Sequence, residues 1–316
     1  MSTPILELRS VVRHFDTPAG RVRAVDDVSL TVRAGETLGL VGESGCGKST
    51  LARLAMRLLP PDSGAILFEG TDLAKAGRGD LARYRARMQM VFQDPLSALN
   101  PRETIGRILE QPLLVHRRGG RAERRARVAQ LLAHVGLRGD IAARFPHELS
   151  GGQRQRVGIA RALALEPRLL LCDEAVSALD VSVRAQVLNL LLRLRGEFGL
   201  AALFISHDLA VVRHVADRVA VMYLGQVVEQ APRDALWRQP RHPYTRALMA
   251  ATPVADPAEA RARPPLPLTG ELPSPIDPPS GCRFHPRCPL ALPRCREDVP
   301  ALRLAGPEHT VACHLA

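Results

Sequence analysis

The sequence predicts an α/β domain built on a mostly parallel sheet, followed by a short extension of different composition. Over the first 250 residues, short apolar runs alternate with longer amphipathic stretches, which is the pattern of strands connected by helices. One of these apolar runs leads into a glycine-rich loop of the phosphate-binding type. Beyond it proline becomes frequent, with 14 of the 26 prolines between Pro253 and Pro307. We therefore expect one domain over residues 1–250 and a proline- and cysteine-rich extension over residues 251–316.

The first element with a chemical role is a buried strand over Glu36–Val41 and the loop that follows it. The loop matches G-x-x-x-x-G-K-[ST] and precedes a helical stretch that ends before Pro60, so it has the strand–loop–helix context that this motif requires. Glycines let backbone N–H groups turn toward phosphate oxygens, and a helix N-terminus favours negative charge. The lysine would contact the β- and γ-phosphates, and the serine after it would hold Mg²⁺. The predicted ATP-binding residues of this loop are Gly42, Ser44, Gly45, Cys46, Gly47, Lys48, Ser49 and Thr50.

A second buried strand, over Arg168–Cys172, ends on two adjacent carboxylates. Asp173 would reach the coordination shell of Mg²⁺, and Glu174 would point at the γ-phosphate and polarise an attacking water as a general base. An acidic pair at the end of a strand is often only solvated. Its interpretation as part of an ATP site therefore depends on the phosphate loop earlier in the chain.

Charge and composition exclude several classes of protein. The chain has 43 basic and 32 acidic residues, a net charge of +11, but lysine occurs only at positions 48 and 75, which favours a compositional bias toward arginine over an anionic partner. Aromatic residues make up 3%, too few for a surface that stacks the bases of single-stranded nucleic acid. No window approaches the 18 consecutive apolar residues of a spanning helix, and the N-terminus lacks the pattern of a secretory signal. We therefore expect a cytoplasmic protein without a nucleic-acid partner.

Four of the six cysteines lie close to the C-terminus, at positions 282, 288, 295 and 313. Because thiols stay reduced in the cytosol, this group suggests metal binding before disulfides. The intervals do not match the paired C-x-x-C of a zinc ribbon. Four thiolates at irregular spacing suit a [4Fe-4S] cluster, while a structural Zn²⁺ and unliganded cysteines stay open as alternatives. His285 or His314 could replace one ligand. The predicted ligands are Cys282, Cys288, Cys295 and Cys313.

Between the two nucleotide elements the chain carries the run Leu-Ser-Gly-Gly-Gln-Arg-Gln-Arg, which resembles the signature motif of ABC-type ATPases. In that family the motif opens a helix whose N-terminus binds the γ-phosphate of ATP held by a second subunit. Its residues here are Ser150, Gly151, Gly152 and Gln153. Four further elements match the family in its own order, namely the adenine-stacking aromatic residue, the Q-loop, the D-loop and the switch histidine. They correspond to Phe15, Gln93, Asp180 and His207.

The resemblance covers residues 1–250 as an ABC nucleotide-binding domain and implies a helical subdomain over roughly 93–165. It implies that Gln93 senses Mg²⁺ or the attacking water, sharing the ion with Ser49 and Asp173, and relays this to a membrane partner. It also implies that His207 contacts the γ-phosphate and stabilises charge in the transition state, beside Glu174 as the base.

One departure from the family lies directly after Glu174. This chain has Ala175 and Val176 where relatives usually carry Pro-Thr. Both carboxylates of the strand end are intact, so we expect the change to affect the local turn and not hydrolysis.

Two phrases narrow the resemblance to the ATPase subunits of oligopeptide and dipeptide permeases, the F-type subunit in particular. One follows the Q-loop and runs from Asp94 to Arg102, and the other is Arg-His-Pro-Tyr-Thr-Arg-Ala-Leu over residues 241–248. This resemblance implies a heterodimer with a homologous D-type ATPase subunit, two transmembrane permease subunits and a solute-binding protein. It also implies a peripheral location on the cytoplasmic face of the bacterial inner membrane and a cluster in the extension. The solute stays open among dipeptide, oligopeptide, nickel chelate and glycoconjugate.

Two other classes of protein fit less well. An ABC ATPase acting on nucleic acid or ribosomes would account for the basic surplus and the cysteine-rich tail, but such proteins usually carry two ATPase domains or a long coiled coil. A small-molecule kinase would use the phosphate loop and leave the signature motif unexplained. The sequence therefore predicts an ATP-hydrolysing subunit of an importer for peptides or a related small solute.

Overall fold

The structure is a computed structural model that describes residues 4–94, 98–252 and 270–316. It divides into two compact units. The first unit comprises residues 1–5, 33–36 and 75–204, and the second comprises residues 6–32, 37–74 and 205–316. Strands alternate with helices in both units, which confirms the predicted α/β fold class.

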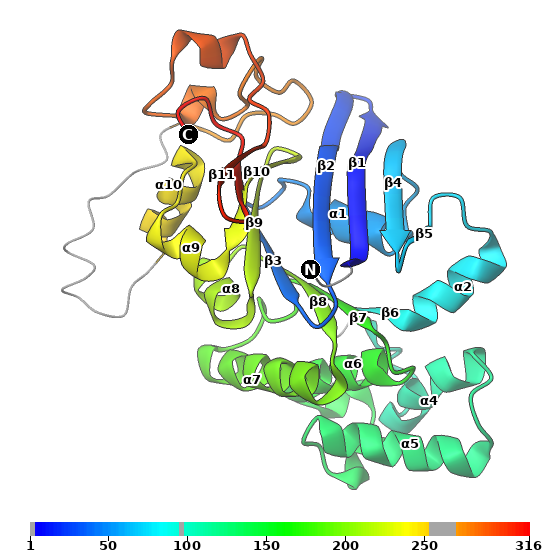
Figure 1. Ribbon diagram of the computed structural model, residues 1–316. Coiled ribbons are helices and arrows are strands. Elements are labelled where there is room, and N and C mark those ends of the chain that lie inside the picture. The colour runs from blue at the N-terminus through cyan, green and yellow to red at the C-terminus, as the bar shows by residue number, and fades with distance from the viewer. Residues whose placement is uncertain (1–3, 95–97, 253–269) are drawn as a thin grey trace. The chain divides into compact units, whose positions relative to one another are not determined.

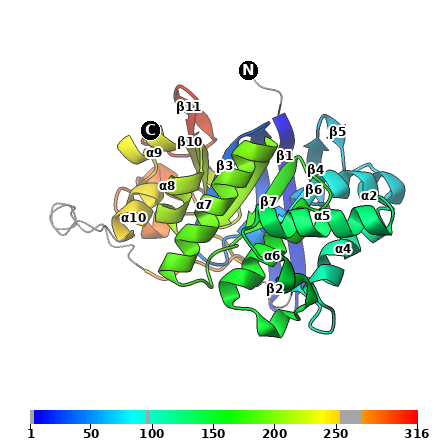
Figure 2. The same ribbon diagram turned by 90° about the horizontal axis from the view of Figure 1, so that it is seen from below.

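The first unit combines parallel strands with a group of packed helices (Figure 2). Strand β7 pairs in parallel with β6, from Met88 opposite Leu169 to Val91 opposite Cys172, and β8 follows β7 in the strand order. Helices α4, α5 and α6 pack against one another. The elements are β6 (Met88–Val91), β7 (Leu169–Asp173), β8 (Ala201–Ser206), α2 (Arg78–Arg87), α4 (Ile105–Val115), α5 (Arg121–His134), η1 (Gly139–Ala143), η2 (Pro146–Glu148), α6 (Gly151–Leu163) and α7 (Val181–Phe198).

The second unit contains an antiparallel sheet with the strand order β2-β1-β4-β5 and a second set of strands in the order β11-β12-β10-β9-β3. Strand β3 pairs in parallel with β9, and β9 pairs antiparallel with β10 (Figure 1). The strands are β1 (Pro4–Thr17), β2 (Gly20–Arg33), β3 (Thr37–Val41), β4 (Ser63–Phe68), β5 (Thr71–Asp72), β9 (Arg218–Tyr223), β10 (Gln226–Pro232), β11 (Arg303–Gly306) and β12 (His309–Val311). The helices are α1 (Lys48–Ala55), α8 (Leu209–Val215), α9 (Arg233–Arg238), α10 (Pro243–Ala251), η3 (His285–Arg287) and η4 (Pro293–Arg296).

The strands that precede the functional loops are buried along their whole length. Every residue of β3, β7 and β9 is buried. Continuous apolar strands of this kind are typical of sheets covered on both faces. The predicted strands over Glu36–Val41 and Arg168–Cys172 are thus confirmed with small shifts in their ends, and α1 starts directly after the phosphate loop as predicted. Among the described residues, no helix is long and apolar enough to cross a membrane.

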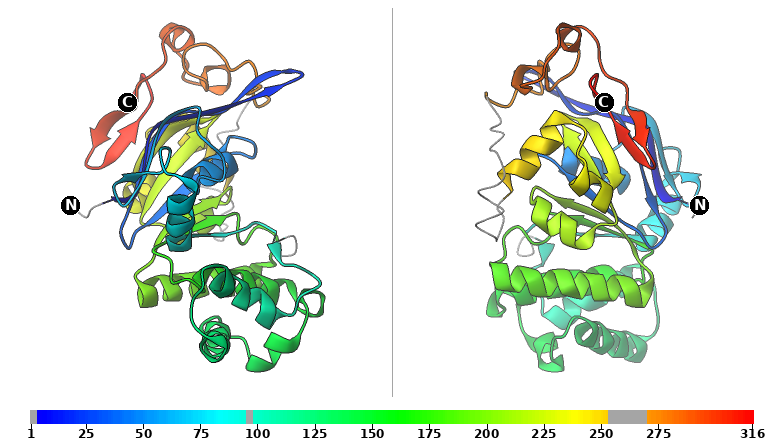
Figure 3. Two further views of the ribbon diagram at one scale, coloured as in Figure 1. Left: turned by 90° about the vertical axis from the view of Figure 1, so that its right-hand side faces the viewer. Right: turned by 60° about the vertical axis from the view of Figure 1, so that its left-hand side comes forward.

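The C-terminal extension adds strands to a sheet, and these strands were not predicted from the sequence. Strand β12 pairs antiparallel with β10, with Glu229 opposite Val311, and β11 pairs with β12 as the outer strand. Figure 3 shows this hairpin in red. The proline-rich segment before η3 covers residues 264–281. Its first residues, 264–269, lie outside the described part of the chain, and residues 270–281 form neither helix nor strand.

Candidate functional site

The phosphate loop follows β3 and is held close to neighbouring backbone by glycines at two positions. A Cβ atom on Gly42 would lie 2.1 Å from the carbonyl oxygen of Met222, and one on Gly47 would lie 2.0 Å from that of Ala24. Gly47 also has φ +104°, a conformation that residues with a side chain rarely adopt. Only glycine therefore fits at these two positions, which explains the motif in terms of packing.

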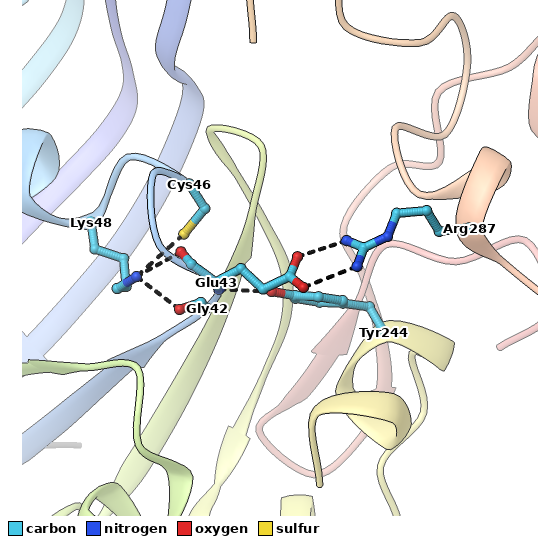
Figure 4. Close-up of polar contacts among 6 residues, drawn as sticks. All are labelled: Gly42, Glu43, Cys46, Lys48, Tyr244 and Arg287. Atoms are coloured by element: carbon cyan, nitrogen blue, oxygen red, sulfur yellow. Dashed lines mark hydrogen bonds and ion pairs between the residues drawn. The ribbon is translucent and has the colours of Figure 1, made fainter. Parts of the chain in front are cut away.

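Lys48 is the first residue of α1, and its ammonium group is bound within the loop (Figure 4). Its Nζ donates to the carbonyl oxygens of Gly42 and Glu43, at 2.8 Å each, and lies 3.7 Å from Cys46 Sγ. Burial raises the pKa of the Cys46 thiol, so this cysteine is a neutral packing residue. Ser44 and Gly45 are exposed. The two hydroxyl residues of the motif, Ser49 and Thr50, lie half-buried in the first turn of α1.

The carboxylates predicted from the second strand lie at the end of β7 in the first unit. Asp173 is buried and ends the strand, and Glu174 follows with φ +47°. Gln93 Nε2 donates a hydrogen bond to Glu174 Oε2 at 3.1 Å. The structure thus brings together the predicted Q-loop glutamine and the predicted base, which are 81 residues apart in the chain.

The turn after Glu174 contains the residues that depart from the family pattern. Ala175 and Val176 are buried, and Ser177 closes the turn by donating from its N–H and its hydroxyl to the carbonyl oxygen of Glu174, at 3.1 and 2.9 Å. The turn is therefore stabilised by Ser177 and does not require Pro-Thr at the two substituted positions.

The signature motif starts α6 with a capping box. Ser150 Oγ accepts from the N–H of Gln153 at 3.3 Å, and Gln153 Oε1 accepts from the N–H of Ser150 at 3.0 Å. Ser150 and Gly151 are exposed, whereas a Cβ on Gly152 would lie 2.5 Å from Cγ1 of Val183 in α7. Asp180, the residue before α7, is also exposed. The start of α6 therefore presents its backbone to the surface.

Two further predicted residues lie in the second unit. Phe15 is half-buried in β1, and the guanidinium carbon of Arg13 lies 4.9 Å from the centre of its ring. His207 is exposed directly after β8, and the next residue, Asp208, caps α8 by accepting from the N–H of Ala210 at 2.9 Å. The proposed contacts of Phe15 with adenine and of His207 with phosphate remain predictions.

The four cysteines of the extension are free thiols that lie within electrostatic reach of one another. The N–H of Cys282 donates to the carbonyl oxygen of Cys295 at 2.8 Å. Burial raises the pKa of Cys282 to about 11 and also raises the pKa of Cys288 and Cys313. Over the described ranges, no three or more His, Cys, Asp or Glu side chains form a group that could hold a metal ion.

The two histidines considered as substitute ligands make other contacts. A ring nitrogen of His285, Nδ1, lies 3.0 Å from the carbonyl oxygen of Cys282, and Nε2 of His314 lies 3.0 Å from that of Asp298.

The structure also explains the His-Pro-Tyr phrase before α10. Glu229 of β10 is completely buried and accepts from the N–H groups of Arg241 and His242, at 2.6 and 3.0 Å. Its carboxylate also contacts Nε2 of His309 in β12 at 2.7 Å. His242 caps α10, since its Nδ1 accepts from the N–H of Tyr244 at 3.0 Å, and burial lowers the pKa of His242 to about 3. One buried carboxylate thus joins the chain before α10 to the extension.

The residues that connect this region to the phosphate loop were not predicted from the sequence. Glu43 lies inside the loop, its N–H donates to the hydroxyl of Tyr244 at 2.9 Å, and its carboxylate pairs with Arg287. An acidic side chain in a loop that binds phosphate needs a nearby cation to compensate its charge. Glu43 could therefore have indicated, from the sequence alone, that such a cation lies nearby. No local pattern identifies Arg287 as this cation, because it lies 244 residues further along the chain.

Comparisons with known proteins agree with this arrangement. A family model described as ABC transporter matches residues 25–177, and one described as oligopeptide/dipeptide transporter, C-terminal region, matches residues 228–295. The "Probable peptide ABC transporter ATP-binding protein y4tS" of Sinorhizobium fredii is 58% identical over 100% of this chain and 91% of its own length. The oligopeptide transport ATP-binding protein AppF of Bacillus subtilis is 51% identical over 98% of this chain and 97% of its own length.

Solved structures give the same picture for the fold. The dimeric ATP-binding cassette MJ0796, in a post-hydrolysis state with ADP and Pi, superposes with a TM-score of 0.67 at 30% identity, covering 72% of this chain and 98% of that chain. The structure of cbiO1 from Clostridium perfringens also superposes with a TM-score of 0.67, at 28% identity, over 75% of this chain and 91% of that chain.

Proposed function

This chain belongs to the oligopeptide/dipeptide branch of the ABC transporter ATP-binding proteins. On this basis we propose which of its residues bind ATP and which catalyse its hydrolysis. The chain is the ATP-binding subunit of a peptide importer and hydrolyses ATP. The observation that carries the proposed mechanism is the hydrogen bond between Gln93 and Glu174. It joins the residue expected to sense the nucleotide to the residue expected to activate water.

In this proposal the phosphate loop binds the β- and γ-phosphates through its backbone N–H groups and Lys48. Phe15 stacks on adenine. Mg²⁺ would be held by Ser49, Gln93 and Asp173, whose oxygen atoms are the donors that this ion prefers, and when bound it would neutralise phosphate charge. The Gln93 side chain suits this role because its NH₂ group contacts Glu174, which leaves its amide oxygen for the ion.

Glu174 accepts a proton from the attacking water in the proposed reaction. The donor from Gln93 holds the Glu174 carboxylate in one orientation, so that its lone pairs are directed before the substrate arrives. His207 donates to the γ-phosphate and stabilises the charge that develops there. His207 is exposed after β8, as a residue that contacts a bound ligand should be.

The exposed start of α6 suits a contact in trans. We propose that Ser150, Gly151, Gly152 and Gln153 bind the γ-phosphate of ATP held by a homologous D-type subunit, with the D-loop residue Asp180 beside them. The dimeric state of the ATP-binding cassette MJ0796 supports such pairing. Two permease subunits and a solute-binding protein would complete the importer, with this chain on the cytoplasmic face of the bacterial membrane.

We further propose that residues 1–250 form the ATPase domain, with its helical subdomain at roughly 93–165, and that residues 251–316 hold a [4Fe-4S] cluster through four cysteines. Four free thiols near one another suit the soft iron of a cluster. When bound, it would cross-link a short segment that has little apolar core of its own. Zn²⁺ is the alternative occupant.

A pull-down tests the proposed assembly. The Glu174→Gln variant, which should retain ATP, is purified by affinity from detergent-solubilised host membranes in the presence of MgATP, and the proteins that come with it are identified by mass spectrometry. We expect two polytopic membrane proteins and a second ATPase. Recovery of nucleic acid or ribosomal proteins without permeases would instead favour the nucleic-acid class.

A further inference from the structure

An ion pair joins the C-terminal extension to the phosphate loop, and both partners belong to the second unit. Arg287 ends η3, and its guanidinium group donates from Nη1 to Glu43 Oε2 at 2.7 Å and from Nη2 to Oε1 at 3.0 Å. Two parallel hydrogen bonds of this kind are the strongest arrangement of an arginine with a carboxylate. The arginine side chain is 6% exposed and the glutamate side chain 25%, so solvent screens the pair only partly.

The backbone of Glu43 is held as firmly as its side chain. Its N–H donates to the hydroxyl of Tyr244 at 2.9 Å, and its carbonyl oxygen accepts from Lys48 Nζ at 2.8 Å and from the N–H of Cys46 at 3.3 Å. Figure 4 shows the Glu43 side chain extending toward Arg287, away from Lys48. One residue of the loop therefore connects the phosphate-binding lysine to two residues of the C-terminal region.

The surroundings of Arg287 fix its position. Its guanidinium carbon lies 6.0 Å from the ring centre of Tyr223, and that ring packs against Tyr244 and Phe284 with centres 4.7 and 5.3 Å apart. The hydrogen bonds with Glu43 raise the pKa of the Arg287 guanidinium, which therefore stays charged.

A neighbouring arginine anchors the same segment. Arg283 donates to the carbonyl oxygen of Leu224 and to the carboxylate of Asp26. Burial by itself raises the pKa of Asp26, but the charge of Arg283 and the hydrogen bonds from His14 and Arg283 hold it below its usual value. The segment that carries Arg287 is thus docked independently of Glu43.

The negative charge of Glu43 links its contact with Arg287 to the binding of nucleotide. A carboxylate within a loop that receives a triphosphate repels the ligand unless a cation compensates it. We propose that Arg287 is a positioning residue that neutralises Glu43 and holds the phosphate loop in its binding conformation, so that docking of the extension sets the affinity for ATP. This inference rests on the proposed role of the loop. By thermodynamic linkage, bound nucleotide strengthens the docking of the extension by the same factor.

The first test measures nucleotide affinity in the full chain by titration calorimetry with MgATP and MgADP. We expect Arg287→Ala to lose affinity about tenfold, a typical size for coupling between linked sites. Arg287→Lys keeps the positive charge but loses the paired hydrogen bonds of the guanidinium group, so its loss of nucleotide affinity should be smaller. Adding Glu43→Gln to Arg287→Ala should recover part of the lost nucleotide affinity, because the uncompensated negative charge of Glu43 is removed. The matched control is Arg294→Ala, which breaks an exposed pair of the extension with Asp298, and it should bind nucleotide normally.

A second readout separates positioning from a general loss of structure. In the assembled transporter, KM for ATP should rise in Arg287→Ala while kcat at saturating ATP is kept. Hydrogen exchange of residues 282–288 should slow when MgADP binds the wild type, and this protection should disappear in Arg287→Ala. Unchanged affinity and unchanged protection in a folded Arg287→Ala protein would overturn the proposal. If that variant does not fold, wild-type affinity and protection in Arg287→Lys would overturn it instead.

Lys48→Ala distinguishes failure of this inference from failure of the proposed function. If Lys48→Ala loses nucleotide and Arg287→Ala does not, only the inference fails. If both variants bind nucleotide as the wild type does, the assignment of the phosphate loop fails as well.

Discussion

At the scale of single residues, the proposed mechanism of hydrolysis rests on the contact between Gln93 and Glu174. Gln93 Nε2 donates to Glu174 Oε2 at 3.1 Å, so an amide donor holds one oxygen of the carboxylate. Glu174 is placed by a buried strand and by a turn that Ser177 closes. The proposed base is therefore oriented by groups that do not depend on a bound nucleotide.

Replacing this carboxylate by an amide should remove hydrolysis and keep binding. We expect Glu174→Gln in the assembled transporter to lower the rate of phosphate release by about 100-fold to 10,000-fold, the usual contribution of a general base. The affinity for MgATP should be unchanged, since the phosphate loop is intact. The measurement pairs steady-state phosphate release with equilibrium ATP binding.

The control for this variant is Glu197→Gln. Glu197 lies in α7, is exposed and pairs with Arg193 at 2.8 Å, so the same chemical change there should leave hydrolysis intact. Equal phosphate release by the wild type and Glu174→Gln would show that this carboxylate is not the base.

At the scale of elements, α10 is fixed by a histidine cap that cannot accept a proton easily. His242 is buried at the helix start, its Nδ1 accepts from the N–H of Tyr244, and burial lowers the pKa of His242 from 6.5 to about 3. The unfolded chain therefore binds a proton at this residue between these two values, and the folded chain does not. Stability must fall as pH drops from about 6.5 toward 3.

An asparagine at this position should remove that part of the pH dependence. Asn can still accept from the N–H of Tyr244, because Asn is a good helix cap, but it does not titrate. Between pH 7.5 and 5.5 we expect the free energy of unfolding of the wild type to fall by about 1 kcal/mol more than that of His242→Asn. Urea unfolding at the two pH values checks this, and identical pH dependence in the two proteins would contradict it.

Elements with local patterns could be predicted from the sequence, and elements with distant partners could not. The apolar runs before the phosphate loop and before Asp173 became β3 and β7, and the signature motif became the start of α6. Strands β11 and β12 are only four and three residues long. Strand β12 pairs with β10, where Glu229 lies 80 residues before His309, and β11 pairs only with β12 among the described strands, so neither length nor periodicity predicted them. The same holds for the candidate site. The motif residues were predictable, whereas the pair of Arg287 with Glu43 depends on the folded chain.

At the scale of the whole molecule, the extension is tied to the sheet by β12 and to the phosphate loop by Arg287. We predict that protein purified without oxygen contains iron and acid-labile sulfide in equal amounts. Cys295→Ser should lose both, because a cluster needs all four thiolates. Elemental analysis and sulfide determination measure this. Stoichiometric zinc without iron would identify the alternative occupant, and absence of any metal would leave the cysteines as unliganded thiols.

We propose that this chain couples ATP hydrolysis to the import of peptides. The most direct measurement is ATP hydrolysis by the transporter reconstituted in proteoliposomes, with and without peptide-loaded solute-binding protein. We expect loaded binding protein to accelerate hydrolysis and Glu174→Gln to abolish this response. A rate of hydrolysis that is unchanged by the loaded binding protein and rises with nucleic acid or ribosomes would contradict this proposal.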